Sequence, residues 1–369
     1  MASQPFTPRW GIMATGGIAQ TFVKDLLTNP ASRDVHDIAH KLVAVASSSS
    51  KASADAFLDK VKAPEGVKTY GSYHELVNDP DVDIVYVATP HSHHFQNTML
   101  ALEAGKHVLC EKAFTVTGSQ ARKLVETAKA KNLFLMEAVW TRYFPLSIKV
   151  RELVQSGVIG PVYRVIADNS LGNDGPNGSV TFPDENRMVN PDLAGEAEKE
   201  APKVAAAINK YSTGADETTT VILQFPKHKS QGVAMTSLRI ATDVDGHNTS
   251  GPAIKIQGPL GEIQVDGPAY RPLQYKVIKK DGGGKVEVVD CPIPVDEARD
   301  VGHGMFWEAD ECARCLRDGK KESATLPLSE SIVIMEVMEE ALKQGDVHYP
   351  DVITTDVYDP KSPLNTGGR

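Results

Sequence analysis

Short apolar runs alternate with amphipathic stretches through the first 140 residues of the chain. Runs of strand length lie at 41–46, 83–88 and 108–110, and each is too short for an ordinary helix. Strands that are apolar on both faces are typical of a buried parallel sheet. With helical stretches at 95–104 and 119–131, the alternation predicts a doubly wound α/β domain. The other elements expected there are a strand from Arg9, a helix with Ile18, Phe22, Leu26 and Leu27 at helical spacing, a short helix at 70–78 and a strand at 133–136.

Beyond residue 145 the pattern changes to a series of strands, and the expected helices lie near the C-terminus. A chain of 369 residues is long enough for two domains, which we expect at 1–145 and 146–369. Helices are expected at 303–316, which should pack back on the first domain, and at 329–343. Strands are expected at 162–168, 203–208, 218–225, 232–240, 253–257, 261–266 and 275–279.

The composition is that of a globular protein and argues against several kinds of partner. Hydrophobic residues make up 41% and charged residues 24% of the chain, and the formal net charge is -9. The acidic balance and the lack of a long basic cluster argue against nucleic acid or an anionic membrane as partner. No apolar run approaches the roughly 20 residues of a membrane span, and residues 1–8 lack the features of a signal peptide. We therefore expect a cytoplasmic protein.

Cysteines and histidines give no strong metal signal. Four cysteines are too few for a disulfide framework in a chain of this size. Cys312 and Cys315 form a single C-x-x-C within a helical pattern and are expected to be helix residues rather than zinc ligands. Three histidines at 91, 93 and 94 suggest a metal, but carboxylates at ligand spacing are missing nearby. No metal site is therefore expected.

A glycine-containing turn follows the first expected strand, as in dinucleotide-binding domains. Gly11 and Gly16 would let the backbone turn tightly and approach a pyrophosphate, whose charge then faces the N-terminus of the next helix. The fingerprint is incomplete, because Ala14 stands where a glycine is usual. The alternative is an ordinary connection from a strand to a helix.

The turn after the second strand indicates which dinucleotide is bound. It reads Ser47-Ser48-Ser49-Ser50-Lys51 and has no Asp or Glu of the kind that holds the ribose 2′-hydroxyl of NAD. Hydroxyl groups and a lysine suit the 2′-phosphate of NADP instead. We therefore favour NADP, the alternative being a flexible serine-rich turn.

The strand at 108–110 brings two charged residues, Glu111 and Lys112, to its carboxyl end. Ligands of open α/β sheets bind at that end of the strands, so Lys112 is placed to meet a cofactor and a substrate together. The alternative is a solvated charge pair that closes a strand. The loop from Thr89 to His94 follows the neighbouring strand, and we expect it to contact the cofactor as well.

Three segments, in this order and spacing, resemble the glucose–fructose oxidoreductase/inositol dehydrogenase family. They are Gly-Ile-Met-Ala-Thr-Gly-Gly-Ile-Ala at 11–19, Ala-Thr-Pro-His-Ser-His-His at 88–94 and Ala-Gly-Lys-His-Val-Leu-Cys-Glu-Lys at 104–112. The segment Glu-Ala-Val-Trp-Thr-Arg at 137–142 is similar to the branch that holds NADP-dependent D-xylose 1-dehydrogenases and dimeric dihydrodiol dehydrogenases. The resemblance covers nearly the whole chain.

The resemblance implies a fold and a reaction. The fold is an N-terminal Rossmann doubly wound domain followed by a C-terminal α+β domain with a large, open, mostly antiparallel sheet, whose exposed face forms a homodimer. The reaction is oxidation of an aldopyranose such as D-xylose at C1, which gives D-xylono-1,5-lactone by hydride transfer to NADP. The general base takes the hydroxyl proton while a nearby positive charge stabilises the developing alkoxide.

The resemblance also implies roles for single residues. Lys112 matches the catalytic lysine of the family. Trp140 and Arg142 match positions near the nicotinamide and the pyrophosphate, although a core role for Trp140 and a surface ion pair for Arg142 are the alternatives. His94 matches a loop histidine that suits packing better than base catalysis. The expected cofactor contacts are Gly11, Ala14, Thr15, Gly16, Gly17, Ile18, Ser47, Ser48, Lys51, Thr89, Pro90, His91, His94, Glu111, Lys112, Trp140 and Arg142.

The chain departs from the family after Gly195. Family members continue there with a Gly-Gly-Ala-Leu-x-Asp-x-Gly-x-Tyr (or His) helix, whose Asp and Tyr or His face the nicotinamide beside the lysine. This chain instead runs through a mostly charged segment, Glu196 to Pro202, and resumes the expected strand at Lys203. We therefore expect a helix near 195–196 to be absent together with the usual proton acceptor, through a gene-model error or a real variant. Activity of this chain should then be strongly reduced.

Three functions remain open at this point. The first is an NADP-dependent sugar dehydrogenase, the second a trans-1,2-dihydrodiol dehydrogenase, and the third a non-catalytic NADP-binding regulator that resembles the yeast galactose-pathway repressor. The discriminating feature is the missing motif. Its presence in the gene beside the Gly195/Glu196 junction favours an enzyme, and its absence from the gene favours the regulator.

Overall fold

The computed structural model describes residues 4–171, 201–297 and 302–366. Contacts divide the chain into two compact units, of which the first comprises Met1–Tyr143, Ile293–Met335 and Tyr349–Arg369. The second comprises Phe144–Pro292 and Glu336–His348. The first unit therefore ends near the boundary expected at residue 145, but it also takes in two later segments. One of these contains the helix that was expected to pack back on the first domain.

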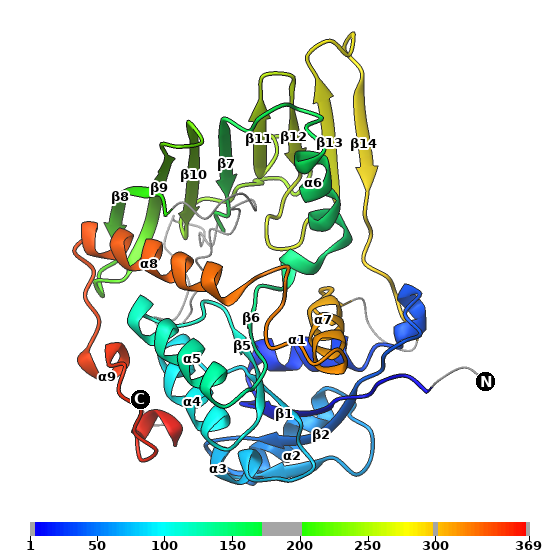
Figure 1. Cartoon of the computed structure of the whole chain (residues 1–369), viewed down its shortest axis with the longest axis vertical. Coiled ribbons are helices and arrows are strands. Elements are labelled where there is room, and N and C mark those ends of the chain that lie inside the picture. Colours follow the sequence, from blue (N-terminus) through cyan, green and yellow to red (C-terminus); the bar gives the residue numbers. More distant parts are fainter. Residues whose placement is uncertain (1–3, 172–200, 298–301, 367–369) are drawn as a thin grey trace. The chain divides into compact units, whose positions relative to one another are not determined.

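The first unit is built on a six-stranded sheet in the order β3-β2-β1-β4-β5-β6 (Figure 1). Every neighbouring pair is parallel. The order reverses between β1 and β4, so this is the topological switch point at whose carboxyl edge such sheets bind ligands. The doubly wound domain predicted from the alternating pattern is confirmed. The strands are β1 Arg9–Met13, β2 Lys41–Ala46, β3 Lys68–Tyr70, β4 Ile84–Val87, β5 His107–Glu111 and β6 Leu135–Ala138.

Helices connect these strands, and further helices come from the end of the chain. The short helix expected at 70–78 begins only at Tyr73, because Tyr70 ends β3 and Ser72 caps the helix by accepting the backbone N–H of Glu75 at 3.3 Å. The helices are α1 Gly17–Leu26, α2 Lys51–Lys60, α3 Tyr73–Val77, α4 His94–Glu103, α5 Gly118–Ala130, α7 Phe306–Arg317, α8 Leu328–Gln344, which continues into the second unit, and α9 Asp351–Thr354, with 3-10 turns η1 Pro30–Arg33, η2 His91–His93, η3 Trp140–Tyr143 and η4 Pro363–Asn365.

The apolar face of α1 differs from the one expected. Phe22 and Leu26 are buried as predicted, whereas Ile18 is 36% exposed in the first turn of the helix. Ala19 and Val23 complete the buried face instead. The position of Ile18 is therefore determined by the turn before the helix and not by the core.

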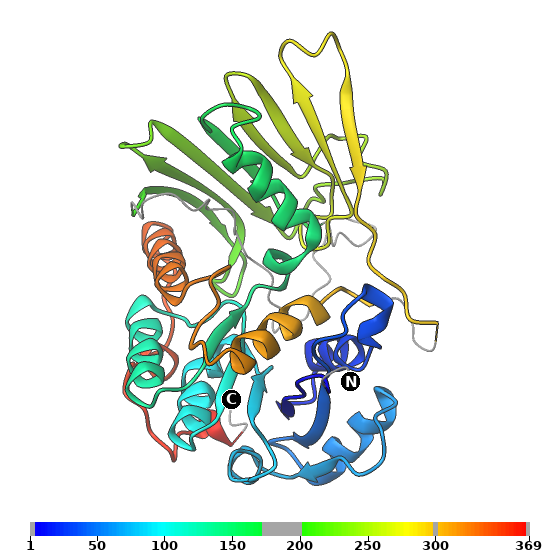
Figure 2. The same ribbon diagram turned by 45° about the vertical axis from the view of Figure 1, so that its right-hand side comes forward.

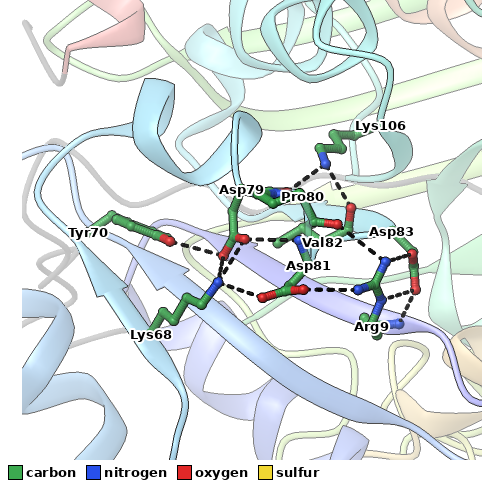
Figure 3. Close-up of polar contacts among 9 residues, drawn as sticks. All are labelled: Arg9, Lys68, Tyr70, Asp79, Pro80, Asp81, Val82, Asp83 and Lys106. Carbon is green, nitrogen blue, oxygen red and sulfur yellow. Dashed lines mark hydrogen bonds and ion pairs between the residues drawn. The ribbon is translucent and has the colours of Figure 1, made fainter.

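A network of ion pairs and hydrogen bonds ties the amino edge of the sheet together (Figure 3). The Arg9 guanidinium at the start of β1 contacts Asp83, with Nη2 2.7 Å from Oδ1. The Lys68 ammonium at the start of β3 lies 2.9 Å from Asp79 Oδ1. Lys106, just before β5, donates to the backbone carbonyl of Asp79 at 2.7 Å. This network lies at the edge opposite to the one expected to bind a ligand.

The second unit contains an eight-stranded sheet in the order β14-β13-β12-β11-β7-β10-β9-β8, and helix α6 Pro145–Gln155 packs against one face of it (Figure 2). The unit also takes in the end of α8, from Glu336. Apart from the parallel pair of β7 and β10, neighbouring strands are antiparallel. The predicted, mostly antiparallel sheet is therefore confirmed. Its strands are β7 Arg164–Asp168, β8 Lys203–Lys210, β9 Asp216–Phe225, β10 Ser230–Ser237, β11 Ile254–Gly258, β12 Gly261–Val265, β13 Gln274–Lys279 and β14 Val286–Asp290.

The two faces of this sheet differ. Leu146 and Val150 of α6 pack with Ile256, Ile263 and Val277 on the covered face. The other face, called here the open face, carries partly exposed apolar side chains among polar ones. Its apolar members include Ile166, Ile222, Val233, Ile278, Val286 and Val288, which share a face by strand register.

Two expectations can be compared only with the residues that the structure describes. The helix expected to be absent after Gly195 lies outside the described residues, which resume just before β8. In the described ranges, no helix combines the length and apolar character needed to cross a membrane.

Candidate functional site

The predicted site residues of the first unit gather at the carboxyl edge of its sheet. Ala14 follows β1, Ser47 follows β2, Thr89 lies just beyond β4 and Lys112 follows β5. Gly11 is the exception, because it lies inside β1. A Cβ there would lie 2.9 Å from Val82 Cγ1 and 3.2 Å from Leu76 Cδ1 of α3, so close packing of these side chains against the sheet accounts for this glycine.

The turn from Ala14 to Gly17 leaves open space in front of helix α1. Among the described residues, and apart from the chain neighbours and the backbone of α1 itself, no heavy atom lies within 4 Å of a Cβ built at Gly16 or at Gly17. The first turn of α1 has no side-chain cap and no acidic residue. Backbone N–H groups at a helix N-terminus attract anions. The arrangement therefore fits a pyrophosphate, and Ile18 beside it is exposed.

Ala14 adopts a backbone conformation that favours glycine. Its φ angle is +90°, while its N–H donates to the carbonyl of Ala46 at 3.0 Å. The sequence fingerprint lacks a glycine at this position, yet the backbone takes the path that a glycine would take. The turn is therefore formed at the cost of local strain.

The serine turn places hydroxyl groups and a lysine at the start of α2. Ser47 is buried, and its Oγ lies 2.9 Å from Ser49 Oγ. Ser50 caps α2 by accepting the backbone N–H of Ser53 at 3.1 Å. The Lys51 ammonium is exposed and lies 2.9 Å from Asp55 Oδ1. The turn can therefore offer several donors to a phosphate, which would compete with the Asp55 carboxylate for Lys51.

Thr89 and His94 join the loops that follow β4 and β5. The ring of His94 lies between two backbone carbonyls, with Nδ1 2.8 Å from Ala113 O and Nε2 3.0 Å from Thr89 O. Burial lowers the pKa of His94 to about 4, so the ring is neutral at pH 7 and donates to one carbonyl at a time. This supports a packing role rather than base catalysis. Thr89 Oγ1 is buried and has no hydrogen-bond partner in the described ranges.

His91 of the same loop has a backbone partner as well. His91 Nε2 lies 2.6 Å from the carbonyl oxygen of Thr115, and Pro90 beside it is exposed. Among the described residues, no group of three or more His, Cys, Asp or Glu side chains is arranged to hold a metal ion. Cys312 and Cys315 are buried residues of α7.

Lys112 is half-buried, and its ammonium has no hydrogen bond or ion pair within the described part of the chain. The neighbouring Glu111 is buried and accepts two hydrogen bonds. Its Oε2 accepts the backbone N–H of Lys112 at 3.0 Å, and its Oε1 accepts the hydroxyl of Tyr86. Burial raises the pKa of Glu111. A cation with free donors therefore stands beside a fixed acidic group at the carboxyl edge.

The segment after β6 places an aromatic ring and a guanidinium in the first unit. Trp140 is mostly buried and stacks on the ring of His303, with centroids 5.5 Å apart. Arg142 is 6% exposed and forms an ion pair with Glu330 of α8. This ion pair is buried, whereas the alternative considered for Arg142 was a surface pair.

Sequence reasoning missed several buried polar residues that support the site. Asp25 of α1 accepts the backbone N–H groups of His303 at 3.0 Å and Met305 at 2.8 Å, which holds the start of α7. Glu308 of α7 is completely buried. The one local signal was an acidic residue within an apolar helical pattern, because the partners lie far away in the sequence.

Comparisons with known proteins agree with this geometry. A family described as oxidoreductases with an NAD-binding Rossmann fold matches residues 9–139. The chain is 63% identical to a D-xylose 1-dehydrogenase (NADP(+)) of Hypocrea jecorina over the full length of both. It is 34% identical to the human trans-1,2-dihydrobenzene-1,2-diol dehydrogenase over 93% of this chain and 98% of that one.

Solved structures show a similar fold. A levoglucosan dehydrogenase in complex with NADH and levoglucosan superposes with a TM-score of 0.74 at 16% identity, over 92% of this chain and 97% of that one. An aldose-aldose oxidoreductase from Caulobacter crescentus gives 0.69 at 20% identity, over 92% and 98%. At these identities the likeness concerns the fold alone.

The alignment with the Hypocrea jecorina relative is longer than the chain itself. It spans 395 positions, whereas the chain has 369 residues. The difference of 26 means that at least this many positions of the relative have no counterpart in this chain.

Proposed function

Because the chain belongs to the glucose–fructose oxidoreductase/inositol dehydrogenase family, we propose that it is an NADP-dependent dehydrogenase that oxidises D-xylose at C1 to D-xylono-1,5-lactone. The observation that carries the proposal is 63% identity to a D-xylose 1-dehydrogenase (NADP(+)) across the full length of both chains. The human trans-1,2-dihydrobenzene-1,2-diol dehydrogenase, at 34%, makes trans-dihydrodiol oxidation the second candidate.

Residues of the carboxyl edge fit NADP. The open turn at Gly16 and Gly17 leaves room for the pyrophosphate at the N-terminus of α1. The Ser47–Ser50 hydroxyls and Lys51 suit the 2′-phosphate, and the buried Thr89 hydroxyl offers a donor. The cofactor supplies the hydride acceptor when bound. The other residues that we propose to surround NADP are Ala14, Thr15, His91, His94, Glu111, Trp140 and Arg142.

Lys112 is the proposed catalytic residue. Its ammonium is half-buried and makes no ion pair within the described ranges, so its donors are available to the sugar hydroxyl. A positive charge beside a developing alkoxide stabilises the transition state more than the ground state. The backbone N–H of Lys112 donates a hydrogen bond to the Glu111 carboxylate, and this bond holds the backbone that carries the lysine side chain.

The general base of the family has no evident counterpart in the sequence of this chain. We propose that the family helix with its Asp and Tyr or His is absent after Gly195, as the charged segment from Glu196 indicates. The positions of the Hypocrea jecorina relative that lack a counterpart here support a missing segment. Removing a general base typically costs about 10²- to 10⁴-fold in rate. Turnover by this chain should then be far below that of a family member that retains the helix.

The test is D-xylose-dependent reduction of NADP by the purified chain, with Lys112→Ala as the diagnostic variant. We expect slow turnover that falls by a further 10²-fold or so in Lys112→Ala. Lys123→Ala, an exposed lysine of α5, is the matched control and should leave the rate unchanged. Turnover that survives in Lys112→Ala would contradict the assigned role.

The same assay separates the other candidates. Faster turnover of a trans-dihydrodiol than of D-xylose would favour the second candidate. NADPH binding without turnover of either substrate would favour the non-catalytic regulator.

We further propose that the protein is a cytoplasmic homodimer. Apolar side chains on the open face of the second unit, Ile222 at 39% and Val288 at 51% exposure among them, support pairing through that face. The cysteines Cys110, Cys291, Cys312 and Cys315 are free, which suits a reducing compartment.

A further inference from the structure

The C-terminal tail, residues 349–366, lies against helices α4 and α5 of the first unit (Figure 1). It forms α9 and η4 and contributes no strand to the sheet. Leu364 and Asn365 of η4 are buried, at 4% and 1% exposure. The tail is therefore anchored by the buried residues of η4, although much of the rest of it is exposed and the sheet is complete without it.

Two neighbouring amide side chains of α4 bind the backbone of the tail. Gln96 donates to the carbonyl oxygen of Val357 at 2.9 Å and accepts the N–H of Asp359 at 3.0 Å. Asn97 donates to the carbonyl oxygen of Leu364 at 3.0 Å. Gln96 is 3% exposed and Asn97 is fully buried, so water does not replace the tail as their partner.

A third amide binds the tail from α5. Gln120 is 1% exposed, and its Nε2 donates to the carbonyl oxygens of Ile353 at 2.8 Å and Thr355 at 2.9 Å. Its Oε1 accepts the backbone N–H of Val116 at 3.0 Å. All hydrogen-bonding groups of this amide are thus used, and both of its donors depend on the tail.

The bound helix α4 is the one that begins at the proposed cofactor loop. Gln96 and Asn97 lie in the first turn of α4, directly after His94, whose ring bridges Thr89 and Ala113. Both α9 and η4 of the tail also contact η2, the turn at 91–93. The tail therefore touches the loop itself and the helix turn that anchors it.

Losing the tail would leave the side-chain NH2 groups of Gln96, Asn97 and Gln120 without the carbonyl acceptors that they now use. Buried polar groups without partners are costly, so the first turn of α4 would move or admit water to satisfy them. A loop that adopts its binding conformation only part of the time binds more weakly, and the apparent Kd rises by the inverse of that fraction.

We propose that the C-terminal tail positions the cofactor loop at 89–94, and that Gln96, Asn97 and Gln120 are the positioning residues that transmit its effect. This inference rests on the proposed function, because it assumes that the loop binds NADP. It adds a segment from the far end of the chain to the determinants of cofactor affinity.

The test is to cut the tail from the rest of the chain once the whole protein has folded. A protease site inserted between His348 and Tyr349 lets the full chain fold before it is cut, and NADPH affinity is measured by fluorescence titration before and after cleavage. We expect the Kd to rise about tenfold on cleavage. A synthetic peptide of residues 349–366, added in excess, should restore the affinity of the intact chain.

Point variants of the uncut chain provide a second test. Gln96→Ala should raise the Kd for NADPH about fivefold or more, while Gln155→Ala, an exposed amide at the end of α6, should not change it. Asp79→Asn disturbs the first unit at its amino edge and should lower its thermal midpoint without changing the Kd. This variant shows whether lost stability alone weakens NADPH binding.

The outcomes are distinct. An intact chain that does not bind NADPH would contradict the proposed function. An intact chain that binds NADPH, but whose Kd is the same after cleavage and in Gln96→Ala, would overturn the role of the tail. Equal effects of Gln96→Ala and Asp79→Asn on the Kd would also overturn it, because a general loss of stability would then explain both.

Discussion

At the residue scale, a substitution at Gly16 can separate the proposed cofactor binding from folding. Apart from its chain neighbours, no atom of the part of the chain that the structure describes lies within 4 Å of a Cβ at this position, and its φ of -70° is open to other residues. We expect Gly16→Val to change the free energy of unfolding by no more than about 1 kcal/mol. The added methyl groups would occupy the space proposed for the pyrophosphate, so NADPH affinity should fall at least tenfold.

Ala14→Gly is the matched change in the same turn. It relieves a φ of +90° and should stabilise the chain by up to about 1 kcal/mol without lowering NADPH affinity. Calorimetry and fluorescence titration of both variants check the pair. Equal NADPH affinities in the two variants would place the pyrophosphate elsewhere.

The buried carboxyl group of Glu308 should make the stability of the protein depend on pH. It is 0% exposed, and neither of its carboxylate oxygens has a hydrogen-bond partner in the described ranges. Burial, and then the charges of Glu111 and Asp25, raise its pKa well above 4.5. The titratable groups that interact electrostatically with Glu308 are Asp25 of α1, Tyr86 of β4, Glu111 of β5, Tyr143 of η3 and Cys312 of α7. All five are acidic or neutral.

The raised pKa of Glu308 makes stability depend on pH in a defined direction. A group whose folded pKa lies above its unfolded pKa contributes full stability below the unfolded pKa and loses it as pH rises toward the folded pKa. Glu308→Gln removes this dependence, because the amide stays neutral. We therefore expect its thermal midpoint to exceed that of the parent by a margin that grows from pH 5 to pH 8.

An exposed glutamate provides the control for this measurement. Glu126→Gln on α5 should show no such trend with pH. A margin that is constant with pH, or a less stable Glu308→Gln at pH 8, would mean that Glu308 is ionised in the folded protein.

The site residues that the sequence predicted are those whose chemistry is local. Gly16 and Lys112 stand in motifs that follow strands, and strand ends are readable from apolar runs. Glu308 and Asp25 were missed because their importance depends on contacts between α7 and elements hundreds of residues away. No spacing rule gives such a contact.

At the element scale, the network at the amino edge joins the starts of β1 and β3 to the segment before β4 (Figure 3). Asp79 is 3% exposed and accepts hydrogen bonds from Lys68 Nζ and from the Tyr70 hydroxyl, both at 2.9 Å. Burial raises its pKa, but the N–H of Asp81, Lys68 and Tyr70 outweigh burial and hold the pKa of Asp79 below 3.8.

Asp79→Asn should therefore destabilise the chain in a pH-dependent way. A depressed pKa contributes stability above the unfolded pKa, and this stability is lost as pH falls through the folded pKa. We expect a loss of about 2–3 kcal/mol at pH 7 and a smaller loss at pH 3. Urea unfolding at both pH values measures this, with the exposed Asp59→Asn of α2 as control. Equal losses at both pH values would assign the effect to packing instead of charge.

Elements with two buried faces were predictable, and those at the margins were not. The apolar run of β2 gave its bounds directly, from Lys41 to Ala46. Helix α6 was not predicted, although Pro145 at the first helical position and Leu146 and Val150 four residues apart are typical of a helix. β14 was missed because it is an edge strand whose side chains are mostly exposed.

At the scale of the whole molecule, the open face of the second unit carries the prediction about assembly. Ile222 of β9 is 39% exposed and lies opposite Val233 of β10 on that face. A charge at this position would have to be desolvated in a dimer, so Ile222→Glu should shift the chain toward monomers in analytical ultracentrifugation. Leu260→Glu is the control, because Leu260 is 53% exposed but lies in the turn between β11 and β12. A parent chain that is monomeric would contradict the proposed homodimer.

The segment that is proposed to be missing after Gly195 can be tested by restoring it. If the chain lacks the helix that holds the proton acceptor, then inserting the corresponding segment of the Hypocrea jecorina relative between Gly195 and Glu196 should raise D-xylose turnover by about 10²-fold or more. The insertion should leave the Kd for NADPH within a factor of about two, because cofactor binding is assigned to the first unit. Replacing the motif Tyr or His of the inserted segment with Phe should remove most of the gain. An insertion variant that folds and binds NADPH, yet turns over no faster than the parent, would show that the proton acceptor lies elsewhere. Lys112 would then remain the proposed catalytic residue, and the general base would have to be another residue of this chain.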